Sequence, residues 1–226
     1  MQALILAAGR GTRMLPLTRT CPKPLLPLGK STLIECQIQQ LVAAGIQSIV
    51  ITLHHLGQQI FDKLGDGSRW NIKITYSWEK QLLDTGGGIV HALPLLAPEP
   101  FLVVNSDIVT NYPYQQLLSH NLNSGGHIIL VNNPANTQGD FNLANTGVVL
   151  PKHAQHASYT FSGISVLHPL LFTDFSAAHK CGSNFTLLRV FKYAMAQGSL
   201  SGSHYLGEWV DAGTNENYQQ LQQLYA

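Results

Sequence analysis

The chain has 226 residues, a length that fits one domain of ordinary size. Only 11% of its residues are charged, and the formal net charge is +1. This balance argues against a nucleic-acid partner, because such proteins normally carry a broad basic surface. No apolar run approaches the roughly 20 residues that span a bilayer, so we expect no membrane association.

Apolar strands and amphipathic helices alternate over residues 1–125. The expected strands are 2–7, 46–53, 71–77 and 100–109, and the expected helices are 31–45, 57–67 and 86–96. Thr32 and Glu35 have the spacing of a capping box at the start of the first helix. This rhythm predicts an α/β fold with a mostly parallel sheet and helices on both faces.

After residue 125 the pattern becomes richer in strands. We expect strands at 126–132, 141–150, 157–169 and 204–213, with helices at 184–198 and 215–226. With so little helix between them, these strands are predicted to be antiparallel and to form a substrate wall. No internal repeat or linker divides the chain, which we therefore interpret as one domain, 1–226.

The cysteines Cys21, Cys36 and Cys181 form no C-x-x-C pair, so neither a disulfide framework nor a zinc site is indicated. The N-terminal apolar run breaks at Gly9 without a basic segment before it, and we expect no signal peptide. Reduced thiols and the lack of a targeting segment predict a cytoplasmic protein.

A glycine-containing loop follows the first strand. In open α/β sheets, ligands bind beyond the carboxyl ends of the strands, where this loop lies. Glycines let backbone N–H groups approach an anion. The loop has no Walker A lysine, and Met14 replaces the third glycine of a dinucleotide fingerprint, so the glycines alone fit a simple tight turn equally well. The proposed anion-binding residues are Ala8, Gly9, Gly11, Thr12 and Arg13.

The longer stretch LAAGRGTRMLPLTRTCPKPLLPLG, residues 6–29, is far more specific. It resembles the signature of the sugar-1-phosphate nucleotidyltransferases at nearly every fixed position. The resemblance implies a Rossmann-like, GT-A-like fold and a defined reaction. In that reaction, a sugar 1-phosphate attacks the α-phosphorus of a nucleoside triphosphate, and pyrophosphate leaves.

Two cations in this stretch suit the reaction, which brings two anions together. Pro22 and Pro24 stiffen the backbone around Lys23, which would bridge the α-phosphate and the sugar phosphate. Arg13 would hold the leaving pyrophosphate. The alternative for Lys23 is an ordinary solvated surface lysine. In either case we expect its loop to face solvent, so that substitution of Lys23 affects folding little.

The resemblance also implies a Mg²⁺ site. Magnesium prefers oxygen ligands and takes one or two carboxylates beside phosphates. Asp107 in VVNSDIV and Asp211 in GEWVDAGT match the two metal-binding aspartates of the family. The alternatives are a turn residue for Asp107 and a helix cap for Asp211.

Base recognition is expected in EKQLLDTGGGIVHA, at Glu79, Thr85 and Gly86. Aligned through Thr85, Glu79 stands where the family pattern has glutamine. A carboxylate only accepts hydrogen bonds, and uracil N3–H and guanine N1–H and N2–H are donors. We therefore favour uracil, then guanine; a solvent-facing Glu79 is the alternative.

The motifs GDFNL, TFSGISVLHP and SGSHYLGEWVDAGT resemble the branch of the family that uses UTP and N-acetylmuramic acid 1-phosphate. The departures are Ser106, where glycine is usual, and Glu208, where histidine is. On this resemblance, residues 1–125 form the nucleotide-binding half and 126–226 the sugar-binding half. The predicted sugar-side residues are Asn105, Asp140, Ser162 and Gly163, and the donors considered for the lactyl carboxylate are Arg69, Lys152 and His204.

Other members of the family remain alternatives, namely mannose-1-phosphate guanylyltransferases and glucose-1-phosphate uridylyl- or thymidylyltransferases. A cytidylyl-directed transferase would share the front motif. A nucleotide sensor without activity would usually lose Lys23 or one aspartate, and all three are kept. The short C-terminus weakly favours a monomer.

Overall fold

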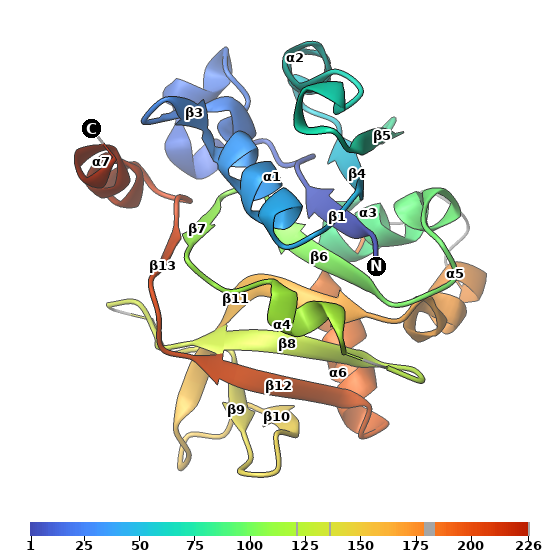
Figure 1. Cartoon of the computed structure of the whole chain (residues 1–226). Coiled ribbons are helices and arrows are strands. Elements are labelled where there is room, and N and C mark those ends of the chain that lie inside the picture. The colour runs from blue at the N-terminus through green and yellow to red at the C-terminus, as the bar shows by residue number, and fades with distance from the viewer. Residues whose placement is uncertain (121, 136, 179–183, 226) are drawn as a thin grey trace.

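A nine-stranded sheet lies at the centre of the molecule in the computed structural model (Figure 1). The structure describes residues 1–120, 122–135, 137–178 and 184–225. Cys181 lies outside these ranges, and Cys21 and Cys36 are free thiols. No helix in the described ranges is long and apolar enough to cross a membrane.

Four neighbouring strands of the sheet are parallel and run in the order β6-β1-β4-β5. They are β1 (Ala3–Leu6), β4 (Ser48–Leu53), β5 (Lys73–Trp78) and β6 (Phe101–Asn105). The connecting helices are α1 (Leu33–Ala43), α2 (Gly57–Leu64) and α3 (Asp84–Ala92). The predicted alternation of strand and helix is therefore confirmed, as is the capping box, in which Thr32 N–H donates to Glu35 Oε2 at 2.8 Å.

Both faces of the sheet are covered, as the continuous apolar strands require. Ala3 and Ile5 of β1 point to the core beneath α1 and α2, while Leu4 between them points to the core beneath α3 and α6 (Leu187–Ala196). Successive side chains of a strand face opposite sides, so a buried run such as Ala-Leu-Ile supplies both cores.

The second half of the chain extends the sheet with mostly antiparallel strands, as predicted. Strand β11 (Ser158–Leu167) pairs antiparallel with β6 and with β8 (Gly126–Val131), and β12 (Leu200–Tyr205) runs parallel to β8. Two predicted strands differ. The expected strand 141–150 is split by a turn into β9 (Phe141–Leu143) and β10 (Val149–Pro151), and 204–213 spans only the end of β12 and a separate β13 (Trp209–Asp211).

The other elements are short or peripheral. In the second half, α5 (Thr173–Ala178) and α6 (Leu187–Ala196) lie on the sheet face of α3. A two-stranded pair joins β13 to β7 (Ile108–Thr110), and another joins β2 (Pro27–Leu28) to β3 (Ser31–Thr32). The last elements are α4 (Gln115–Leu118), α7 (Asn215–Leu224) and the short 3₁₀ helices Thr12–Met14, Leu17–Arg19, Lys23–Leu25, Ser68–Trp70, Leu93–Leu95 and Pro169–Phe172.

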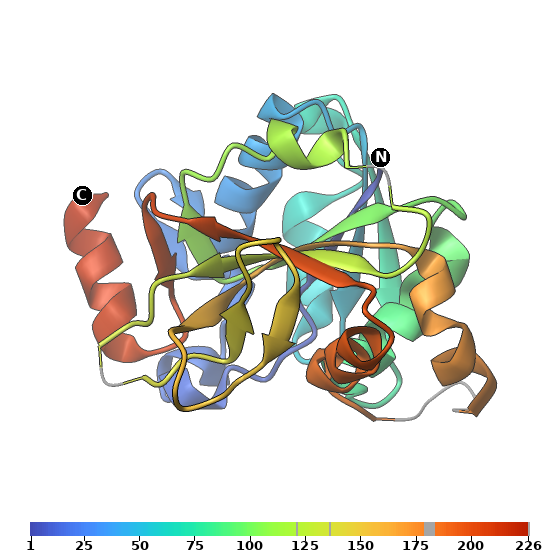
Figure 2. The ribbon, with the colours of Figure 1, turned by 90° about the horizontal axis from the view of Figure 1, so that it is seen from below.

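The terminal helix α7 packs against the segment 14–33, on the side of the molecule away from α5 and α6 (Figure 2). Tyr218 donates its hydroxyl to the carbonyl of Pro27 at 2.7 Å. Leu221 is buried in a small core with Met14 and Leu33. Residues 215–224 therefore brace the loops after β1, although they belong by sequence to the second half.

Candidate active site

A cleft of about 380 Å³ opens beyond the carboxyl ends of β1, β4, β5 and β6. This is the edge at which ligands bind in open α/β sheets. Ten of the residues predicted from sequence line it: Ala8, Gly9, Gly11, Thr12, Arg13, Lys23, Glu79, Thr85, Asn105 and Asp107.

The glycine loop owes its shape to Gly11, whose φ is +62°. A side chain there would be strained and would place its Cβ 2.9 Å from Thr18 Cγ2. Thr18 donates its hydroxyl to the carbonyl of Gly11 at 2.7 Å, which fixes the turn. Gly9 is exposed, and nothing lies within 4 Å of the position a Cβ would take, so a ligand can approach its backbone.

Lys23 is buried rather than solvent-facing, so the expectation of an exposed loop was wrong. Its short 3₁₀ helix turns the side chain inward beneath the glycine loop, where Lys23 Cβ lies 3.3 Å from the position of a Cβ on Gly11. The ammonium contacts the carboxylate of Asp107 and lies 4.0 Å from Asp211 Oδ1. Lys23 therefore carries its charge into the cleft.

The two aspartates meet because β13 pairs with β7. Asp211 lies opposite Ile108, the residue after Asp107, and Ala212 N–H donates to the carbonyl of Asp107 at 2.9 Å. Arg13 reaches the same place, with its guanidinium 3.9 Å from Asp211 Oδ2. The helix-cap alternative for Asp211 is excluded, since Thr214 caps α7 by accepting from Asn217 N–H.

The carboxyl of Asp211 is in a strongly charged and partly buried environment. Burial raises its pKa, and the nearby charge of Asp107 adds to this, while Lys23 and Arg13 act in the opposite direction. Its Oδ1 is buried and has no hydrogen-bond partner among the described residues. Such an oxygen is costly to bury without a partner, and a divalent cation beside it would supply one.

These carboxylates fit a site that is completed by a ligand. The described residues contain no group of three or more His, Cys, Asp or Glu side chains that could hold a metal alone. Magnesium commonly takes one or two carboxylates and completes its shell with water and phosphate oxygens. The pair Asp107 and Asp211 matches that pattern.

Glu79 and Asp84, which follow β5, line the end of the cleft away from Lys23; this part is called the acidic end. Glu79 is only 6% exposed, which excludes the solvent-facing alternative. Its Oε2 accepts a hydrogen bond from Leu83 N–H at 3.0 Å, and its Oε1 lies against Gly88, 2.8 Å from the position of a Cβ. Burial raises the pKa of Glu79, although the Leu83 N–H bond and the charge of His54 lower it.

Thr85 and Gly86 have different environments. Thr85 lines the cleft, and its hydroxyl accepts from Leu187 N–H at 2.8 Å. Gly86 is not among the lining residues. A Cβ on it would lie 2.6 Å from the ring of Phe185, so this position has no side chain because Phe185 fills the space.

Of the predicted sugar-side residues, the structure brings only Asn105 into the cleft. Gly163 lies directly behind it, where a Cβ would be 2.7 Å from Asn105 Nδ2. Ser162 is fully buried, and its carbonyl accepts from the indole N–H of Trp209 at 2.8 Å. Asp140 is exposed and accepts from Phe161 N–H at 2.8 Å.

The three donors considered for a lactyl carboxylate all lie outside the cleft lining. Arg69 forms an ion pair with Glu35 and stacks on Trp70, 3.7 Å from the ring centroid. Lys152 donates to Gln138 at 3.2 Å, and His204 is 2.9 Å from Asn132 Oδ1. Arg69 is thus held by the nucleotide-side half, while Lys152 and His204 belong to the second half.

Several residues that line the cleft were not predicted from the sequence, namely Leu6, Ala7, Pro24, Thr52, Leu82, Asp84, Ser106 and Gly213. Thr52 had a usable signal, because it lies near the carboxyl end of a predicted strand. Asp84 had none, since its φ of +60° and its place on the cleft wall depend on tertiary packing.

The fold and the cleft define a nucleotide-binding transferase, and the chain belongs to the nucleotidyl transferase family, whose sequence pattern matches residues 2–226. Members of this family use a nucleoside triphosphate and a sugar 1-phosphate, generally with a divalent metal ion. The chain is 43% identical to N-acetylmuramate alpha-1-phosphate uridylyltransferase of Neisseria meningitidis serogroup B over 220 residues, which cover 95% of this chain and 94% of the relative.

Other relatives match in part. The mannose-1-phosphate guanyltransferase of Emericella nidulans is 41% identical over 120 residues, 52% of this chain and 33% of that protein. Two crystal structures share the fold. A Bacillus anthracis protein assigned as a glucose-1-phosphate thymidylyltransferase has a TM-score of 0.88 at 21% identity, covering 100% of this chain and 95% of that one. HddC of Yersinia pseudotuberculosis has a TM-score of 0.80 at 22% identity, covering 100% and 99%.

Proposed function

We propose that this nucleotidyltransferase transfers the uridylyl group of UTP to N-acetylmuramic acid α-1-phosphate, giving UDP-N-acetylmuramic acid and pyrophosphate. The near-full-length similarity to the meningococcal uridylyltransferase supports the choice of substrates. The single structural observation that carries the proposal is that Arg13, Lys23 and Asp107 line one end of the cleft, with Asp211 within 4.0 Å of both cations although it is not itself a lining residue.

The cationic residues suit the chemistry. The sugar phosphate oxygen attacks the α-phosphorus in line, the bond from that phosphorus to the bridging oxygen breaks, and pyrophosphate leaves with the electron pair. In this proposal, Lys23 offsets the repulsion between the two phosphates. Arg13, which is more exposed, is proposed to hold the leaving pyrophosphate.

Asp107 and Asp211 would hold Mg²⁺, the metal we propose for this site. The ion would neutralise charge on the triphosphate oxygens. Lys23 contacts Asp107 and lies 4.0 Å from Asp211, and this charged cluster is the proposed binding place of the phosphates and the metal ion.

Glu79 is proposed to read the base. Its Oε1 can accept from uracil N3–H, while Oε2 stays bound to Leu83 N–H. Guanine presents donors on the same edge, and the partial matches to mannose-1-phosphate guanyltransferases keep GTP with mannose 1-phosphate as a second candidate.

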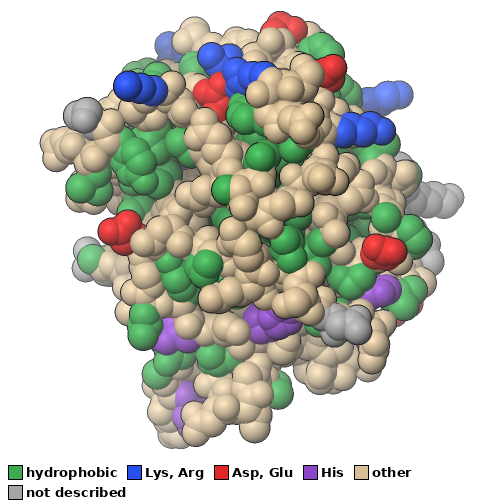
Figure 3. Space-filling view, viewed as in Figure 1, with side chains coloured by type: hydrophobic (Ala, Val, Ile, Leu, Met, Phe, Trp, Pro, Cys, Tyr) green, Lys and Arg blue, Asp and Glu red, His purple; other side chains and the backbone are tan. Residues whose placement is uncertain are grey.

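On the sugar side, we propose that Asn105 and Asp140 bind hydroxyls, with Ser162 and Gly163 forming the wall behind them. Because Glu35 engages Arg69, the lactyl carboxylate is assigned to Lys152 or His204. Histidines are conspicuous on the second-half elements in Figure 3. We further propose that the enzyme acts in the cytoplasm as a monomer, in peptidoglycan recycling.

Pyrophosphate release tests the proposal. The protein with Mg²⁺ is supplied with UTP, dTTP, GTP, ATP or CTP, each with N-acetylmuramic acid 1-phosphate, glucose 1-phosphate or mannose 1-phosphate. The proposal predicts the highest kcat/KM for UTP with the muramic acid substrate. Faster turnover of GTP with mannose 1-phosphate would replace it with the second candidate, and no turnover with any pair would indicate a nucleotide sensor.

A further inference from the structure

The acidic end of the cleft is bounded by residues 82–85, of which Leu82, Asp84 and Thr85 line it. This wall belongs by sequence to the nucleotide-side half. Its polar groups, however, are bound by residues 184–187, at the start of α6 in the other half.

Phe185 is the centre of these contacts. Its N–H donates to the carbonyl of Leu83 at 3.1 Å, and its carbonyl accepts from the N–H groups of Gly86 and Gly87 at 2.9 and 3.1 Å. On either side, Asn184 Nδ2 donates to the carbonyl of Leu82 at 3.3 Å, and Leu187 N–H donates to the hydroxyl of Thr85 at 2.8 Å.

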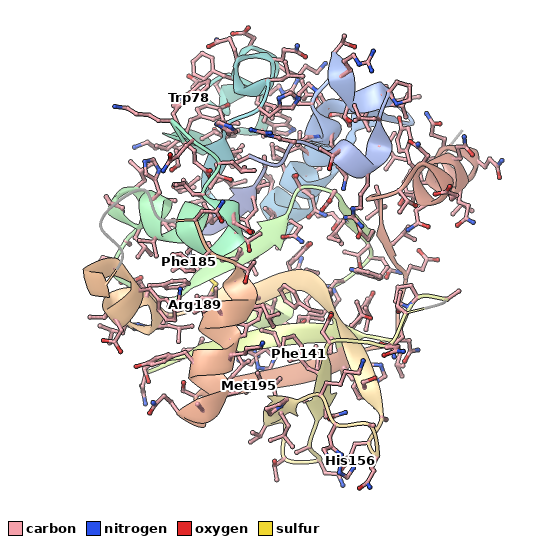
Figure 4. The ribbon with its side chains drawn as sticks, turned by 180° about the vertical axis from the view of Figure 1, so that it is seen from behind. Trp78, Phe141, His156, Phe185, Arg189 and Met195 are labelled. Carbon is pink, nitrogen blue, oxygen red and sulfur yellow. The ribbon has the colours of Figure 1, made fainter. Side chains whose placement is uncertain are left out.

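The Phe185 ring also holds the start of α6 against the cleft wall by steric contact; this contact region between residues 184–187 and 82–87 is called the joint below. Phe185 is 6% exposed, stacks on Phe175 with the ring centroids 5.5 Å apart, and fills the space beside Gly86. Figure 4 shows Phe185 at the end of α6 that faces α3. Close-packed contacts of this kind transmit a shift of the ring or carbonyl directly to the wall.

A short route leads from Phe185 to the proposed base-reading carboxylate. The Leu83 carbonyl accepts from Phe185 N–H, and the Leu83 N–H donates to Glu79 Oε2. One residue thus links Phe185 to Glu79. In the first turn of α3, the Phe185 carbonyl also occupies the N–H groups of Gly86 and Gly87, so these two groups are not free to bind a phosphate.

We propose that Phe185 is a positioning residue for the nucleotide, through which α6 holds the cleft wall and Glu79 in the geometry that binds the base. The proposal rests on the proposed function for the identity of that nucleotide. It predicts that loosening this joint weakens nucleotide binding selectively and leaves binding of the sugar phosphate largely unchanged.

The test compares Phe185→Ala, the conservative Phe185→Leu, and Asn184→Ala, which removes one exposed contact and should fold normally. Phe191→Ala is the matched control, because Phe191 on α6 is also buried but packs against Phe141 and Phe161 instead. For each protein, calorimetry gives the Kd of UTP, and steady-state rates give the KM of each substrate.

We expect Phe185→Ala to raise the Kd and KM for UTP about tenfold and Asn184→Ala two- to threefold, with the KM for the sugar phosphate changed less than about twofold. Phe185→Leu should retain most of the affinity, and Phe191→Ala should keep the wild-type Kd for UTP.

Unchanged UTP affinity in Asn184→Ala and Phe185→Ala, or an equal loss in Phe191→Ala, would overturn the proposal. If Phe185→Ala does not fold, Asn184→Ala decides. The UTP affinity does not depend on turnover, so failure of the proposed acceptor would be seen separately.

Discussion

Lys23 lies between two carboxylates on the floor of the cleft, which gives its substitution two consequences. Removing a positioned charge from a site of this kind commonly lowers the rate by about 10²–10³-fold, and we expect a fall in kcat/KM of this order for Lys23→Ala. Asp107 and Asp211 would also lose their shared cation, so the variant should unfold at a lower temperature without divalent metal.

Arg10→Ala provides the control for Lys23→Ala, since Arg10 is an exposed cation of the glycine loop and does not line the cleft. Its kcat/KM should stay within about twofold of the wild-type value. Wild-type rates in Lys23→Ala, or an equal loss in Arg10→Ala, would contradict the role given to Lys23.

The buried carboxyl of Glu79 should make the free energy of unfolding depend on pH. Burial raises its folded-state pKa above the ordinary value of 4.5, so the folded state loses stability as the pH rises from that value through the folded-state pKa. Glu79→Gln removes this loss while keeping an acceptor for Leu83 N–H. In urea unfolding, the variant should gain stability over the wild type at pH 7 and lose that advantage below about pH 4. A gain that is the same at both pH values would contradict the assignment.

Among the secondary-structure elements, α7 packs against the loops after β1 and stabilises them. Leu221 is 2% exposed in the core that contains Met14 and Leu33, whereas Leu224, one turn further on, is 76% exposed. Leu221→Ala should lower the free energy of unfolding by about 2–5 kcal/mol. Leu224→Ala should change it by less than about 0.5 kcal/mol, as expected for a surface substitution. Equal effects of the two substitutions in chemical denaturation would show that α7 does not pack as described.

The elements with a strong local pattern could be predicted from sequence. Strands β1, β4 and β6 are largely apolar or β-branched runs, β5 is rich in β-branched and aromatic residues, and α1 carries its own capping box. Strand β13 has only three residues and exists because Trp209–Asp211 pairs with Thr110–Ile108. The turn between β9 and β10 likewise depends on contacts such as Gly202 N–H to the Gly147 carbonyl, which no local pattern encodes.

For the molecule as a whole, the cleft-lining residues could be predicted where they follow a strand or belong to a long sequence motif. Residues 8–13, Lys23 and Asp107 have such signals. The burial of Lys23, the position of Asp84 and the placement of Gly86 against Phe185 were not predictable. They result from contacts between segments that are far apart in sequence, such as Gly86 with Phe185 and Lys23 with Asp107.

We propose that Asp107 and Asp211, which come from strands far apart in the sequence, act at the same phosphate site as Lys23. The most direct test of this proposal is the Mg²⁺ dependence of pyrophosphate release, titrated in the wild type, Asp107→Asn, Asp211→Asn and the control Asp62→Asn, whose carboxylate is exposed on α2. We predict that both site variants need a higher Mg²⁺ concentration for half-maximal rate and turn over at least about 100-fold more slowly, while Asp62→Asn titrates like the wild type. Unchanged titration curves in both site variants would contradict the account.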